Sequence, residues 1–190
     1  MKTQLFMLTL AMACTFGGNA NALTKEEYKT QKDQISADLK VNRDKCSSLK
    51  ANAKDICVSE AKGLEKVAKA ELEAKYEPTP RHQEQLGMAK ADAAYDTAKE
   101  KCDDLAGNAK DVCVKDAKAV HVKAKEDAKV AKVSADTRQT ASGKLADAKK
   151  EANIDKRDAD YKAAKERCDS LAGTAKDTCQ NDAKQKFGMK

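Results

Sequence analysis

Residues 102–113 read CDDLAGNAKDVC, and two related stretches occur elsewhere, CSSLKANAKDIC at 46–57 and CDSLAGTAKDTC at 168–179. In each stretch, ten residues separate two cysteines. Around the last two stretches, residues 94–118 and 160–184 are identical at 16 of 25 positions. An internal repeat of this kind predicts a repeated structural unit, so we expect three copies of one small element.

The sequence on both sides of each cysteine pair is typical of α-helix. Apolar and small residues recur at alternating spacings of three and four, for example at Tyr95, Ala98, Cys102 and Leu105. Most other positions are alanine, lysine or an acidic residue, several of them strong helix formers. Every repeat cysteine lies on such an apolar seam, so we expect its thiol to face a partner helix. The pattern predicts an all-α protein.

In one hypothesis, each cysteine pair links the two helices of a hairpin close to its turn. Gly107 would supply the left-handed residue that ends the first helix. Asn108 would cap the second helix, with Asp111 at its positive end. Cys102 and Cys113 would then meet at one level across the turn. Asn52 with Asp55 and Thr174 with Asp177 repeat these helix-start residues, although Ala51 stands where glycine is wanted.

The alternative keeps each stretch within one unbroken helix, giving three long helices with cross-helix disulfides. Eleven helical residues separate two sulfurs by about 16 Å, far beyond the roughly 7 Å Cα limit for a disulfide. Three cysteines would lie at each level, so two thiols of a monomer would stay unpaired. Hairpins pair all six, which favours three disulfide-stapled hairpins, about six helices, in an elongated antiparallel bundle or array. The six cysteines assigned this structural function are Cys46, Cys57, Cys102, Cys113, Cys168 and Cys179.

Breaks in the helical pattern divide the chain. The two prolines, Pro78 and Pro80, end the first unit, and a softer break follows at 140–143. We therefore expect hairpin repeats at 23–77, 81–140 and 143–187.

Residues 1–22 have the pattern of a cleaved secretory signal peptide. Lys2 precedes an apolar run from Leu5 to Phe16, and residues 20–22 read Ala-Asn-Ala, a typical cleavage site. The run is too short to span a bilayer, and no later segment is longer. We expect a periplasmic protein without a transmembrane segment in its mature chain. The alternatives are secretion, or a lipid anchor on Cys14.

The expected core is thin. From residue 23 onward, Leu, Ile, Val and Phe together number 22 of 168 residues, so covalent staples would contribute much of the stability. The formal net charge is +6, but basic and acidic residues alternate finely. No basic block suggests specific nucleic-acid binding. An envelope protein or an anionic surface fits better as a partner, and the sequence leaves the oligomeric state open.

The motifs of the common enzyme classes are absent. There is no nucleophile elbow, no phosphate-binding glycine loop, no zinc-protease motif and no calcium loop. Structural zinc sites require closer cysteines or histidine partners, and His82 and His121 are isolated and expected at the surface. We therefore expect no enzyme, no catalytic residue, no cofactor and no metal.

The stretches AKAELEAKY at 68–76 and AKADAAYDTAKEKCDDL at 89–105 resemble a group of small exported Ala/Lys-rich helical proteins of proteobacteria. These proteins are labelled by similarity to the TolA stalk of the cell envelope, whose membrane anchor this chain lacks. The resemblance implies an envelope setting and carries no catalytic residue. We thus predict a non-enzymatic exported spacer, scaffold or stress-related binding protein. The alternative is a periplasmic thiol protein that buffers metal ions or oxidants.

Overall fold

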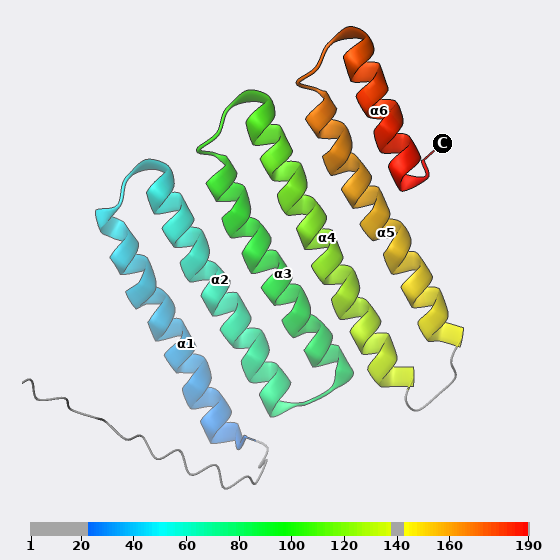
Figure 1. Cartoon of the computed structure of the whole chain (residues 1–190). Helices are drawn as coiled ribbons and strands as arrows, with labels where there is room; N and C mark the ends of the chain where they lie inside the picture. The colour runs from blue at the N-terminus through cyan, green and yellow to red at the C-terminus, as the bar shows by residue number, and fades with distance from the viewer. Residues whose placement is uncertain (1–22, 138–142, 190) are drawn as a thin grey trace, which may run out of the picture.

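The structure is a computed structural model that describes residues 23–137 and 143–189. Within these ranges the chain is all-α and forms three helical hairpins (Figure 1). The prediction of three disulfide-stapled hairpins is confirmed, and the alternative of three long helices is wrong. The elements are α1 Lys25–Lys45, a short 3-10 turn Cys46–Ser48, α2 Ala51–Tyr76, α3 Pro80–Cys102, α4 Gly107–Thr137, α5 Gly143–Cys168 and α6 Gly173–Phe187.

The six helices lie side by side in a single layer, with neighbours antiparallel (Figure 1). In the described ranges each helix packs only against the helix before it and the helix after it. Of the two arrangements left open by the sequence, bundle and array, the structure is therefore an array. The disulfide-bonded hairpin tips all lie along one edge of the layer, and α1 and α6 form its two ends.

Local chemistry explains where α1 and α3 begin. Thr24 caps α1 through a reciprocal capping box with Glu27. Thr79 accepts a hydrogen bond from the backbone N–H of His82, and Pro80 occupies the first turn of α3, where no backbone donor is needed. The predicted break at Pro78 to Pro80 is thus the start of α3. The second predicted break, at residues 140–143, lies mostly outside the described residues.

The core consists mainly of alanine and cystine. Among the buried apolar side chains of residues 23–137 and 143–189, Leu72 is the one large aliphatic residue, and the others are alanines and three cysteines. Small residues let the helices approach closely. A methyl group added at Gly63 would lie 3.0 Å from the Ala93 Cβ atom, and one added at Gly87 would lie 2.7 Å from that of Ala128. Close approach of alanine-rich faces replaces large apolar burial as the packing mode of this layer.

None of the helices in the described ranges is long and apolar enough to cross a membrane. The expectation of a signal peptide concerns residues 1–22, and the lipid-anchor alternative concerns Cys14. Both lie outside the described residues.

Candidate functional site

Each hairpin is closed near its tip by a disulfide whose first cysteine is almost completely buried. The Cα atoms of the three pairs lie 5.6, 5.6 and 5.7 Å apart, within the range of unstrained disulfides. All cysteines in the described residues are bonded in this way. The pairs are Cys46–Cys57, Cys102–Cys113 and Cys168–Cys179.

The turn residues differ from the prediction at the starts of the second helices. Gly107 has the expected left-handed backbone, with φ of 55°, but it is the first residue of α4. The hypothesis that Asn52, Asn108 and Thr174 cap the second helices is wrong, because all three already lie within the first turn of α2, α4 and α6. α2 also starts without any side-chain cap hydrogen bond.

Both asparagines instead join one hairpin to the next. The side-chain nitrogen of Asn52 donates to the Glu100 backbone oxygen at 2.8 Å and to Asp104 at 2.8 Å. The side-chain nitrogen of Asn108 donates to the Glu166 backbone oxygen at 3.1 Å. The same two carbonyls also accept from the backbone N–H groups of Asp103 and Asp169 at 3.1 Å, so each asparagine adds a second hydrogen bond at the C-terminal end of α3 or α5.

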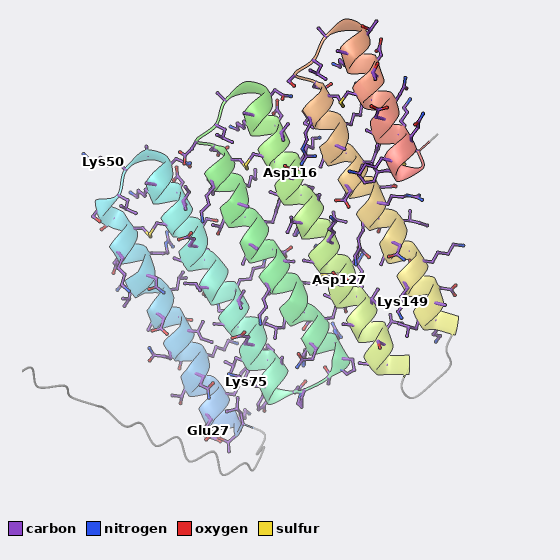
Figure 2. All side chains as sticks on the ribbon, viewed as in Figure 1. Glu27, Lys50, Lys75, Asp116, Asp127 and Lys149 are labelled. Atoms are coloured by element: carbon purple, nitrogen blue, oxygen red, sulfur yellow. A yellow bond between two sulfur atoms is a disulfide. The ribbon has the colours of Figure 1, made fainter. Side chains whose placement is uncertain are left out.

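Ion pairs continue the same two interfaces, between α2 and α3 and between α4 and α5. Charged side chains project all along the layer, including Asp116 and Asp127 on α4 (Figure 2). Individually such exposed pairs contribute little, about 0–1 kcal/mol. Two of them, Glu60–Lys101 and Glu71–Lys90, recur at equivalent positions between α4 and α5. The pairs are Glu60–Lys101 at 3.1 Å, Glu71–Lys90 at 3.1 Å, Lys66–Asp92 at 3.0 Å, Lys123–Asp160 at 2.6 Å, Lys115–Glu166 at 3.7 Å, Asp116–Arg167 and Asp127–Lys156.

Asp92 of α3 is the most connected charge of the structure. Its carboxylate accepts hydrogen bonds from Lys66 of α2 at 3.0 Å and from the Nε2 atom of His121 of α4 at 2.7 Å, and Lys125 lies at 3.6 Å. Burial by itself raises the pKa of Asp92. The hydrogen bonds from His121 and Lys66 and the charges of Lys66 and Lys125 outweigh it and lower the pKa to about 2. Asp92 therefore links three helices and two hairpins.

His121 is buried, being 8% exposed, so the prediction of a surface histidine is wrong for this residue. Its ring stacks on Tyr95 with centroids 4.6 Å apart, and the Lys118 Nζ atom lies over the same tyrosine ring, 5.1 Å from its centroid. The Nδ1 atom is buried and has no hydrogen-bond partner among the described residues. The periodicity of a single helix carries no signal for this cluster, because its members come from three helices, α2, α3 and α4.

A carboxylate–imidazole pair can perform acid–base chemistry when it reaches a substrate. Here the groove between α2 and α3, of about 340 Å³, is lined by Lys66 and Asp96 but by neither Asp92 nor His121. A second, more apolar groove of about 240 Å³ runs between α1 and α2, with Ile35 and Leu39 in its wall. In the part of the chain that the structure describes, no group of three potential metal ligands comes together. The contacts that the structure gives this pair join α2, α3 and α4.

Comparisons with protein-family models, with curated proteins and with solved structures find no significant match for this chain.

Proposed function

We propose that this protein is an exported, non-enzymatic spacer or scaffold of the cell envelope, working by surface contact. The single observation that supports this function is the one-layer array of disulfide-closed hairpins. Because each described helix packs only on its sequence neighbours, both broad faces of the layer stay available for contact. Disulfides form and persist in oxidising compartments, which fits export to the periplasm.

The hairpin tips support a contact function. Each tip carries a leucine three residues after the first cysteine, and each of these leucines is about 40% exposed. The residues are Leu49 at 39%, Leu105 at 44% and Leu171 at 42%. An envelope protein is therefore the partner we propose first, and an anionic surface the second.

A complementation experiment tests this function in the producing cell. A strain lacking the gene would receive the wild-type protein, a variant with all six repeat cysteines replaced by serine, or His121→Phe. A scaffold requires the hairpin array that the disulfides stabilise, so the serine variant should not complement the deletion. His121→Phe, if it folds, should complement it. Loss of complementation by a folded His121→Phe variant would contradict a scaffold and indicate chemistry at Asp92 and His121.

The thiol-buffering alternative predicts a different redox state. Protein released with the periplasmic fraction and trapped at once with an alkylating reagent should carry no reactive thiol among the six repeat cysteines if it is a scaffold. Several alkylated cysteines together with bound metal would support the buffer and overturn the proposal.

A further inference from the structure

The two internal interfaces between hairpins use equivalent positions of the repeat. The acidic residue three positions after the second cysteine of one hairpin pairs with the basic residue one position before the first cysteine of the next. In the first interface these residues are Glu60 and Lys101, at 3.1 Å, and in the second they are Asp116 and Arg167. The two interfaces therefore use this ion pair at the same positions of the repeat to join successive hairpins.

The same two positions occur, unused, at the ends of the array. Lys45 stands one position before Cys46 on α1, and Asp182 stands three positions after Cys179 on α6. Both are exposed, and neither forms an ion pair within the described residues. The Lys45 ammonium donates only to Asn42 in its own helix, at 3.2 Å. Each end of the layer therefore carries one half of the charge pair that joins the internal hairpins.

The outward edge of α1 also exposes the surface that inner hairpins cover. Ala93, nine positions before Cys102, packs against Gly63 of the preceding hairpin. Ala163, five positions before Cys168, is buried at 3% exposure. In α1 the equivalent residues are Ala37 and Val41; both are exposed, and Val41 is 54% exposed. The outer edge of α1 thus has the features of an inter-hairpin interface, an exposed valine beside an unpaired lysine, but no neighbouring helix covers it in the described residues.

We infer that copies of this chain associate head to tail, with the α6 edge of one copy on the α1 edge of the next. Asp182 would pair with Lys45, and Thr174, which replaces the asparagine of the first two hairpins, would face the end of α1 near Asp44. Such a contact joins two different surfaces, so it continues the layer as an open chain of copies. The inference goes beyond the proposed function and can fail without it, because a single copy can also act as a spacer.

The end-to-end contact is expected to be weaker than the internal ones. The second shared ion pair, Glu71–Lys90 and Asp127–Lys156 inside the layer, has no counterpart, because Gln34 replaces the lysine and α6 ends at Phe187. Gln185 stands where the first hairpin has Gly63. α6 would thus cover only the tip half of α1, and the association should weaken with added salt.

Charge reversal at the two positions tests this inference. Analytical ultracentrifugation of the chain, as its producing cell processes it and with disulfides formed, would measure the weight-average mass against concentration at low and at high salt. We expect Lys45→Glu and Asp182→Lys each to raise the dissociation constant by about fivefold or more, since repulsion replaces attraction. Lys149→Glu and Asp147→Lys change the net charge equally on α5 and should leave the constant unchanged.

A mixing experiment separates the pairing from misfolding. Lys45→Glu has an acidic residue at both edges and Asp182→Lys has a basic residue at both. Each variant should therefore associate more weakly by itself than in an equimolar mixture of the two. The double variant should also associate like the wild type. A wild-type chain that stays monomeric at every concentration would overturn the inference. So would single variants that associate normally, or a mixture that does not associate.

Discussion

The side-chain nitrogen of Asn52 lies 2.8 Å from the backbone oxygen of Glu100, and this bond joins the start of one hairpin's second helix to the end of the next hairpin's first helix. The equivalent Asn108 makes the same connection to Glu166. A residue type that would ordinarily cap its own helix here donates to a neighbour's carbonyl. The register between hairpins is therefore specified by hydrogen bonds as well as by alanine packing.

Asn52→Ala should lower the free energy of unfolding by about 1 kcal/mol, because it removes the hydrogen bonds from Asn52 to the Glu100 carbonyl and to Asp104. Urea denaturation followed by circular dichroism measures the change. Thr174→Ala is the matched control at the same repeat position in α6, which packs only on α5 within the described residues, and it should change stability by no more than about 0.5 kcal/mol. Equal effects of the two substitutions would contradict the inter-hairpin function of Asn52.

The lowered pKa of Asp92 should make the free energy of unfolding decrease at acidic pH. Because its pKa falls from 3.8 in the unfolded chain to about 2 in the fold, the ionised carboxylate stabilises the protein above about pH 4. That contribution, about 1–2 kcal/mol for a partly exposed group, is lost as the pH falls from about 4 to about 2. Unfolding free energies measured across this range should decline less steeply for Asp92→Asn than for wild type. Asp96→Asn, one turn further along α3, should keep the wild-type slope.

Much of the fold could be predicted from the cysteine stretches. The ten-residue gap and Gly107 indicate a hairpin, because an unbroken helix would hold the two sulfurs too far apart. The single layer could not be predicted. An inner helix such as α3 needs two packing faces, and alanine is small enough to lie on either a packing face or a surface, so the pattern shows only one seam.

The polar contacts between helices could not be predicted from the sequence either. Asn52 has good helix-cap chemistry, and only the position of the next hairpin shows that Glu100 is its acceptor. His121 looks like an isolated surface residue because its partners, Asp92 and Tyr95, lie in another helix. Such contacts depend on which faces meet, and local periodicity carries no information about that.

Of the three disulfides, Cys168–Cys179 should contribute most to the stability of the helices that it joins. α6 is 15 residues long, packs only on α5 and buries one residue, Ala183. A helix of this length is marginal by itself in water, so losing a link that contributes about 3 kcal/mol should let it open. In Cys168→Ser/Cys179→Ser, amide hydrogen exchange in α6 should accelerate at least about tenfold. In Cys102→Ser/Cys113→Ser, α3 and α4 should keep more of their protection, because each packs on two neighbours. Unchanged exchange in α6 would contradict this ranking.

Ala51 occupies a backbone conformation that suits glycine. Its φ is 48°, close to the 55° of Gly107 and the 56° of Gly173 at the equivalent positions. An L-residue in this region costs about 1–2 kcal/mol relative to glycine, so Ala51→Gly should raise the free energy of unfolding by about 1 kcal/mol. A methyl group added at Gly107 or Gly173 would meet no atom within 4 Å. Gly107→Ala and Gly173→Ala should therefore destabilise the protein by a similar amount, through the backbone alone. Chemical denaturation of the three variants measures this, and a destabilising Ala51→Gly would show that the first turn does not share the backbone of the other two.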